Sequence, residues 1–276
     1  METFNLYSLN TPTFFLMFIL IYLFAYFVVF HNWGPKHRAE ASSCFISLAH
    51  GTPAVFMAGY ATLNTQKSLR TLASPNTIFQ NFVLEYSIAY FLMDLLHYII
   101  FLPRDVLFIL HHVATLYVLV TCRYAVHYGA FEILVILILA EVTSACQNVW
   151  SLASFRKADV PASAKLHELL SPPFYTFYSV VRGIMGPLFV YKMWVFYLSG
   201  AADHSIPKWA RVSWMIVIIA GVLLSILWIL NNWIGWYREL SYRAGKKVRL
   251  LMLNFTTNFS VRCPKGVTSF NGLLEE

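Results

Sequence analysis

The chain has 276 residues, of which 58% are hydrophobic and only 12% are charged. Soluble domains carry roughly a quarter charged residues, so this composition excludes an ordinary soluble globular domain. Long unbroken apolar blocks predict an all-α fold, a polytopic membrane bundle of helices. Much of the net charge of +7 lies in the C-terminal segment. The sequence shows no basic domain with interleaved aromatic residues that could bind nucleic acid, so we expect no nucleic-acid partner.

Seven apolar segments each approach the ~20 residues that a helix needs to cross a bilayer. They comprise residues 13–31, 41–62, 79–101, 105–125, 129–151, 172–199 and 210–236. No small-residue cleavage site follows the first segment, so we expect a retained membrane helix and not a signal peptide. The expected organisation is an N-terminal helix with a cytosolic link (1–40), a six-helix membrane domain (41–236) and a basic cytosolic tail (237–276).

The connections between segments are mostly short. The turn at residues 102–105 joins the third and fourth segments, and Asp105 stands where an acidic residue stabilises a helix N-terminus. Short links make neighbouring helices antiparallel. We expect the longest internal loop at about residues 152–171, with Pro172 and Pro173 opening the sixth helix, where proline is tolerated.

Lys and Arg residues favour one orientation. With the tail in the cytosol, that side holds 13 of the 20 basic residues, the opposite side holds five, and Arg182 and Lys192 lie within a segment. Since cytosolic loops carry the excess of Lys and Arg, we expect a multi-pass integral membrane protein with a cytosolic C-terminus.

Polar side chains interrupt five consecutive apolar segments. They are His50 in the second, Asp94 and His97 in the third, His111 and His112 in the fourth, Glu141, Ser144 and Asn148 in the fifth, and Arg182 in the sixth. Ionisable residues inside a membrane are costly and usually face a bundle interior or a hydrated cavity. Counting ~1.5 Å per residue places all of them in the cytosolic half of the bilayer or near its middle. The pattern predicts one polar cavity that opens to the cytosol.

Structural interpretations of the same residues stay open. Asp94 and His97 could neutralise each other within one helix, and Glu141 and Arg182 could form an interhelical ion pair. His50 could bind a backbone carbonyl that Pro53 leaves without a donor. Both His111 and His112 could also be structural.

Such a cavity could support two kinds of chemistry: catalysis by an imidazole, and metal binding. An imidazole beside a carboxylate can act as a general base or become acylated. Metal binding is not predicted, because adjacent histidines lack the i,i+4 spacing that aims two ligands at one ion. The four cysteines, Cys44, Cys122, Cys146 and Cys263, show no zinc or disulfide spacing.

Three blocks of sequence resemble the TLC domain family (TRAM, LAG1, CLN8). They are Asp94-Leu-Leu-His97, then Pro103-Arg-Asp105, then Phe108-Ile-Leu-His111-His112-Val-Ala-Thr115, and Glu141-Val-Thr-Ser144 continues the match. The resemblance covers roughly residues 41–236 and is closest to small TLC domain-containing proteins, not to full ceramide synthases.

The resemblance implies a lipid-related protein of the endoplasmic reticulum or a related endomembrane. In ceramide synthases the paired histidines and two aspartates one helix later form the acyl-transfer site. His111 and His112 match the pair, and Glu141 stands in place of the first aspartate. Ser144 stands in place of the second and carries no carboxylate, which weakens the ceramide synthase assignment.

Three functional hypotheses follow, of which the third, a cargo receptor or transporter, has no supporting motif. The first is a lipid-homeostasis protein that binds or modifies lipids in the cavity. The second is a ceramide-synthase-like N-acyltransferase that uses acyl-CoA as co-substrate and a sphingoid base as acceptor. In the second, His111, His112, Glu141 and Asp94 are the expected catalytic residues. The expected substrate-binding residues are His97, Arg182, Ser144, Asn148 and His50. No resident cofactor is expected; the expected partners are membrane lipids, a sphingoid base or a fatty acyl chain, and a homo-oligomer is a candidate assembly.

The expected orientation makes a prediction about glycosylation. Asn254 and Asn258 each begin an N-glycosylation sequon. If the tail is cytosolic, neither is glycosylated, and endoglycosidase treatment of the protein from microsomes leaves its gel mobility unchanged. A mobility shift that is lost on Asn254→Gln or Asn258→Gln would reverse the orientation.

Overall fold

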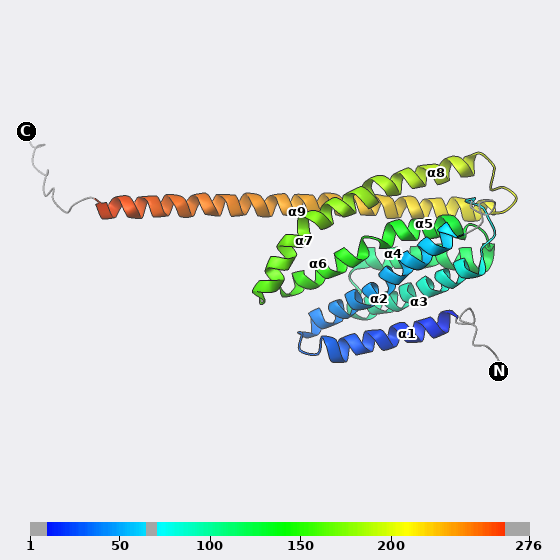
Figure 1. Cartoon of the computed structure of the whole chain (residues 1–276), viewed down its shortest axis with the longest axis horizontal. Helices are drawn as coiled ribbons and strands as arrows, with labels where there is room; N and C mark the ends of the chain where they lie inside the picture. Colours follow the sequence, from blue (N-terminus) through cyan, green and yellow to red (C-terminus); the bar gives the residue numbers. More distant parts are fainter. Residues whose placement is uncertain (1–9, 65–70, 263–276) are drawn as a thin grey trace, which may run out of the picture. The chain divides into compact units, whose positions relative to one another are not determined.

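A computed structural model describes residues 10–64 and 71–262, which are predominantly helical (Figure 1). The α-helices are α1 (Thr11–Phe24), α2 (Pro35–Leu63), α3 (Ile78–Phe101), α4 (Val106–Val120), α5 (Ala130–Glu141), α6 (Ser144–Arg156), α7 (Pro161–Val180), α8 (Gly186–Leu198) and α9 (Lys208–Arg262). Three π-helical segments accompany them: η2 (Ala25–Val29), η4 (Thr121–Val126) and η5 (Val181–Met185). Within the described ranges the only strand-like pairing is an isolated bridge between Pro75 and Tyr128. The expected all-α class is confirmed.

Within residues 10–64 and 71–262, five helical stretches are long and apolar enough to cross a membrane. They are Thr11–Val29, Ile78–Phe101, Val106–Val126, Ala130–Arg156 and Lys208–Tyr242. They correspond to the expected first, third, fourth, fifth and seventh segments. The other two expected segments form α2 and the α7–η5–α8 run, which are helical but less apolar.

The position of α2 accounts for its lower hydrophobicity. This helix packs against α1, α3, α5 and α6, so much of its surface meets protein. Ser42, Ser43 and His50 are buried in it. A helix enclosed by other helices can carry such groups where they find partners across the interface.

Two expectations about the loops are wrong. The expected loop at residues 152–171 is mostly helical, because α6 continues to Arg156 and α7 begins at Pro161. Pro161 occupies the first turn of α7, where its missing N–H costs nothing. Pro172 and Pro173 therefore lie inside α7 and do not open a helix.

The expected role of Asp105 is confirmed, since it is the N-cap of α4 and its side chain accepts from the Phe108 N–H.

The expected continuous helix through Glu141, Ser144 and Asn148 is interrupted. Helix α5 ends at Glu141 and α6 begins at Ser144. The two residues between them, Val142 and Thr143, are β-branched, and such side chains lose rotamer freedom in a helix. Both residues keep right-handed helical backbone angles, so α5 and α6 still form one membrane-crossing stretch.

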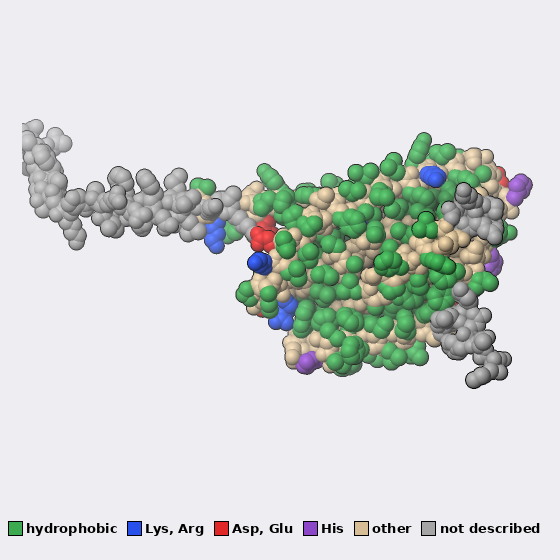
Figure 2. Space-filling model, viewed as in Figure 1, with side chains coloured by type: hydrophobic (Ala, Val, Ile, Leu, Met, Phe, Trp, Pro, Cys, Tyr) green, Lys and Arg blue, Asp and Glu red, His purple; other side chains and the backbone are tan. Residues whose placement is uncertain are grey.

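The chain divides into two units, residues 1–229 and residues 230–276. The first is the helical bundle, whose core joins buried apolar side chains of α1, α3 and α5 among others. Figure 2 shows hydrophobic side chains over most of the visible face of this bundle, with charged side chains near its ends. The second unit contains the helical residues up to Arg262, with exposed Tyr237 and Tyr242. Lys67, Arg70, Cys263 and Lys265 lie outside the described residues.

Gly129 is a position where the fold requires glycine. Its φ is +86°, and an added Cβ would lie 3.1 Å from Glu132 Oε1, 3.1 Å from Trp214 and 3.2 Å from Ile206. Its N–H donates to the Ser74 carbonyl at 3.0 Å, which links the segment before α3 to the start of α5.

We predict that Gly129→Ala destabilises the bundle, since a left-handed non-glycine residue alone costs about 1–2 kcal/mol. Unfolding of the purified protein in detergent, followed by circular dichroism, measures the change. Gly59→Ala is the matched control: an added Cβ there meets no atom within 4 Å, and alanine favours a helix. Equal free energies of unfolding for Gly129→Ala and Gly59→Ala would contradict the requirement for glycine at position 129.

Candidate functional site

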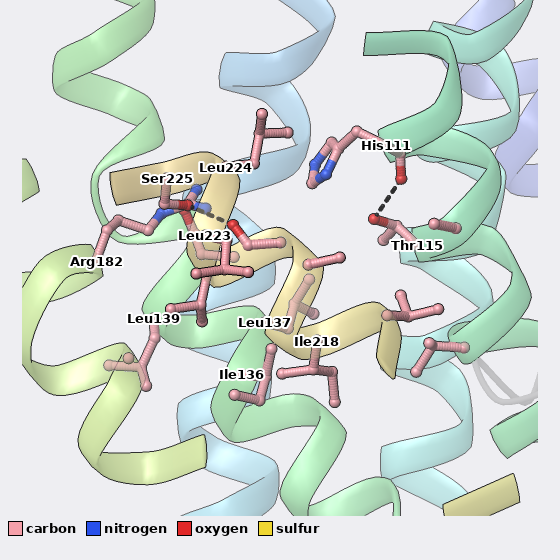
Figure 3. A pocket seen from close by; sticks show the side chains of 18 of the residues that line it. His111, Thr115, Ile136, Leu137, Leu139, Arg182, Ile218, Leu223, Leu224 and Ser225 are labelled. Atoms are coloured by element: carbon pink, nitrogen blue, oxygen red, sulfur yellow. Dashed lines mark hydrogen bonds between the residues drawn. The ribbon is translucent and has the colours of Figure 1, made fainter. Parts of the chain in front are cut away.

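A cavity of about 500 Å³ lies inside the bundle and is lined mainly by apolar side chains. Helices α4 and α5, segment η5 and the part of α9 between Val217 and Leu227 form its walls (Figure 3). Its polar side chains are His111, Thr115, Glu141, Arg182 and Ser225. An apolar pocket with a few convergent polar groups is the usual form of a small-molecule site.

His111 reaches this cavity from α4. Its half-buried ring points from that wall toward the interior (Figure 3). The ring lies edge-on to His112, with centroids 5.7 Å apart. Among the described residues no hydrogen bond to the ring of His111 is found, while the Thr115 hydroxyl donates to its backbone carbonyl at 2.9 Å. His111 therefore keeps ring nitrogens available for a ligand.

Arg182 approaches from the opposite wall, on η5 (Figure 3). Pro187 follows this segment, and since proline has no N–H and its ring clashes with the carbonyl of residue i−4, it disfavours regular α-helix there. Such π-helical segments often occur at functional sites. The guanidinium donates to the Ala140 carbonyl and lies over the ring of Tyr178, 5.4 Å from its centroid. The buried Nε has no hydrogen-bond partner in the described part of the chain.

Glu141, at the end of α5, also lines the cavity although it is almost fully buried. Its Oε2 lies 4.0 Å from His50 Nδ1, and neither atom has a hydrogen-bond partner. A Cβ at Gly51 would lie 2.7 Å from Oε2, so only glycine leaves room for the carboxyl. Ser144 lies beside the Glu141 carboxyl, because a Cβ added at Gly51 would also lie only 3.2 Å from the Ser144 Cβ.

His112 is turned away from the cavity and pairs with Asp94. Its Nε2 lies 2.9 Å from Asp94 Oδ2, and its Nδ1 lies 2.8 Å from the Phe108 carbonyl oxygen. The Ser43 hydroxyl donates to Asp94 Oδ1 at 2.6 Å, and the Tyr90 hydroxyl donates to Oδ2 at 3.4 Å. Since an imidazole that donates from both nitrogens is protonated, the geometry suits an imidazolium–carboxylate pair.

The two adjacent histidines thus have different environments. His112 has both ring nitrogens engaged and no free lone pair, so it is not poised as a base or nucleophile. His111 keeps a ring nitrogen with a free lone pair, so it can act as a base or a nucleophile. The expected cavity centred on both histidines is corrected in this respect: His111 lines it, together with Glu141 and Arg182, while His112, Asp94 and His97 are absent from its lining.

The remaining expected site residues bind elsewhere in the bundle. His97 Nδ1 lies 2.9 Å from the Tyr22 hydroxyl, and among the described residues no ion pair within 4.0 Å joins His97 to Asp94. His50 Nε2 lies 3.1 Å from the Ser87 hydroxyl, which replaces the expected carbonyl partner. The Asn148 amide donates to Ser47 at 2.8 Å, between α6 and α2.

Two further expectations concern ion pairs and metals. Within the described part of the chain, Glu141 and Arg182 form no ion pair within 4.0 Å. The same residues contain no group of three or more His, Cys, Asp or Glu side chains placed to hold a metal ion. The cavity therefore offers separate hydrogen-bonding groups and not a ligand cluster.

Several partners of the expected residues were not predicted from sequence. Tyr90 lies one turn before Asp94 on α3, a spacing that could have indicated it. Ser43, Tyr22 and Ser87 lie on other helices or other turns and give no comparable signal. Ser225 reaches the cavity from α9, and its hydroxyl donates to the Gly221 carbonyl at 2.9 Å.

Two comparisons with known proteins point to the same domain. The family model described as "TLC domain" matches residues 40–234. A curated TLC domain-containing protein of Arabidopsis thaliana is 56% identical over 243 residues, which cover 87% of this chain and 94% of the relative.

The different environments of the two histidines predict different effects on stability. Breaking a buried ion pair by removing one partner costs roughly 3–5 kcal/mol, so we expect a loss of this order for His112→Ala. His111→Ala, the adjacent control, should lose far less, because its ring holds no hydrogen bond within the described residues. Denaturation in detergent compares both variants with the wild type. Equal losses would contradict the pairing.

Proposed function

Because this chain belongs to the TLC domain family of membrane proteins, which are generally lipid-related, we propose that it acts in lipid homeostasis by binding a lipid in the cavity between α4, α5, η5 and α9. The observation that carries the proposal is the composition of the cavity wall. Apolar side chains supply most of it, and His111, Glu141 and Arg182 supply its ionisable groups.

This composition suits an amphiphile. An apolar chain gains roughly 0.8 kcal/mol for each methylene that leaves water, but little on passing from lipid into an equally apolar pocket. Selective binding from a membrane therefore depends on the polar end. The Arg182 guanidinium can donate to an anionic or carbonyl oxygen, and the carboxyl group of Glu141, which lines the cavity, can accept from a hydroxyl or amine. His111 can do either.

One observation favours a second candidate function, acyl transfer. The His111 ring faces the cavity without a described hydrogen-bond partner, as a nucleophile or general base requires. In that reaction an imidazole nitrogen attacks an acyl-CoA thioester and the CoA thiolate leaves. An amine such as a sphingoid base then attacks the acyl group, the bond from the acyl carbon to the imidazole nitrogen breaks, and the proton that the amine loses goes to the thiolate. The Asp94–His112 pair would position α4 behind His111 and would not itself react.

The proposed location is the endoplasmic reticulum or a related endomembrane, with the C-terminus in the cytosol. The excess of Lys and Arg on the expected cytosolic side supports this orientation. The same family resemblance supports the compartment.

The test compares wild type with His111→Ala and Arg182→Gln after reconstitution into vesicles that contain a photoactivatable fatty acid. We expect covalent capture of the fatty acid to fall several-fold in both variants, because each removes a polar group from the cavity. His204→Ala, an exposed histidine outside the cavity, serves as the control and should equal wild type. Unchanged capture in both cavity variants would refute the proposed site.

The enzyme candidate has its own outcome. The same preparations are incubated with acyl-CoA and a sphingoid base, and N-acylated product is measured by mass spectrometry. If wild type makes product, His111→Ala should abolish it. Capture of the fatty acid without any product would leave lipid binding and exclude this acyl transfer.

A further inference from the structure

Three residues that line the cavity are also exposed on the outer surface of the bundle. Leu107 and Leu110 belong to α4, and Leu227 belongs to α9. Between 49% and 59% of each is exposed. A side chain that faces both the cavity and the exterior marks a mouth, so the cavity opens between α4 and α9.

Contacts between the same two helices frame this mouth at both ends. At one end Phe108 stacks on Trp228, with ring centroids 4.8 Å apart. At the other the Tyr117 hydroxyl donates to Ser213 at 2.8 Å, and the Trp214 indole N–H donates to Thr121 at 2.8 Å. Phe108 and Tyr117 are nine residues apart, about 13 Å along α4. Contacts between α4 and α9 therefore close the opening at both of its ends along the helices.

Small residues occupy the opening itself. Ala114 on α4 and Ala220 and Gly221 on α9 all line the cavity. An added Cβ at Gly221 would meet no atom within 4 Å, so the space beside it is empty. Replacing this glycine with leucine would put a side chain into that space.

The mouth lies within two membrane-crossing stretches. Residues 106–126 and 208–242 are both candidate spans, and the α4 and α9 residues that line the cavity fall within them. The side chains around the opening are leucines, which are suited to lipid tails and poorly suited to water. The opening therefore meets the hydrocarbon of the bilayer.

We propose that the cavity is loaded sideways from the bilayer, through the opening between α4 and α9, and that its ligand is an amphiphile already dissolved in the membrane. The ligand's apolar chain passes between Leu110 of α4 and the small residues Ala220 and Gly221 of α9, and its polar end reaches His111 and Arg182. This inference rests on the proposed function for the identity of the ligand, but the route can be tested without it.

The test places a cysteine on the cavity wall, Thr115→Cys, in protein reconstituted into vesicles. Two maleimides are compared: a long-chain N-alkyl maleimide dissolved in the membrane, and a charged maleimide confined to water. Peptide mass spectrometry reads alkylation at position 115 alone, so the native thiols do not contribute. We expect faster alkylation by the N-alkyl maleimide.

Closing the opening should then slow that reaction. Gly221→Leu, added to Thr115→Cys, should lower the alkylation rate several-fold. Gly235→Leu is the control on the same helix, since its added Cβ also meets no atom and it does not line the cavity. A second pair guards against misfolding: Leu110→Trp should slow alkylation, while Leu20→Trp on α1, with a native leucine of nearly equal exposure (58% against 59%), should not.

Alkylation by the charged maleimide at an equal or higher rate would overturn lateral loading. So would an N-alkyl maleimide rate that neither Gly221→Leu nor Leu110→Trp changes. The proposed function fails separately: if the maleimide results hold but His111→Ala and Arg182→Gln still capture the photoactivatable fatty acid, the route stands and the polar contacts do not.

Discussion

The ion pair between Asp94 and His112 is the interaction on which the arrangement of the site depends. A carboxylate enclosed by helices in a membrane has no water to solvate it, so its hydrogen-bond donors must come from the protein. Asp94 obtains them from three helices: Ser43 on α2, Tyr90 on its own helix α3 and His112 on α4. The pair therefore sets the rotation of α4 relative to α3. Removing one member would leave a buried charge without its partner.

That rotation has a direct consequence for the neighbouring residue. Successive residues of a helix point about 100° apart, so once His112 faces α3, His111 must face another direction. It faces the cavity, which also meets Glu141 and Arg182. Two residues of the same type, next to each other in sequence, thus serve different purposes. One holds the helices together, and the other presents an imidazole to whatever the cavity binds.

Departures from regular α-helix place the other ionisable groups. Glu141 ends α5 just before the interruption, with its carboxyl beside Gly51 and His50, and the π-helical segment η5 carries Arg182 on the opposite wall. Pro187 gives a physical reason for the second departure, and the β-branched Val142 and Thr143 favour the first. Because α9 closes the remaining side only partly, small residues at positions 114, 220 and 221 leave the cavity in contact with the bilayer.

Periodicity and composition were sufficient for the elements but not for their breaks. The membrane-crossing segments and the cap at Asp105 were predicted from runs of apolar residues and from a single acidic residue after a turn, because these signals are local. The loop at residues 152–171 was predicted wrongly. Its mixture of charged and polar residues resembles a loop, while helix formation from Pro161 depends on packing of α7 against α6.

The sequence by itself determined that this is a helical membrane protein of the TLC family and that polar residues gather in its spans, since burying charge in lipid is costly whatever the fold. Only the tertiary structure decided which of those residues share a site. Asp94 could have paired with His97 on its own helix, and Glu141 with Arg182. The rotation of each helix chose His112 for Asp94 and left Glu141, Arg182 and His111 on the cavity wall, and rotation is set by packing across interfaces, which no single segment encodes.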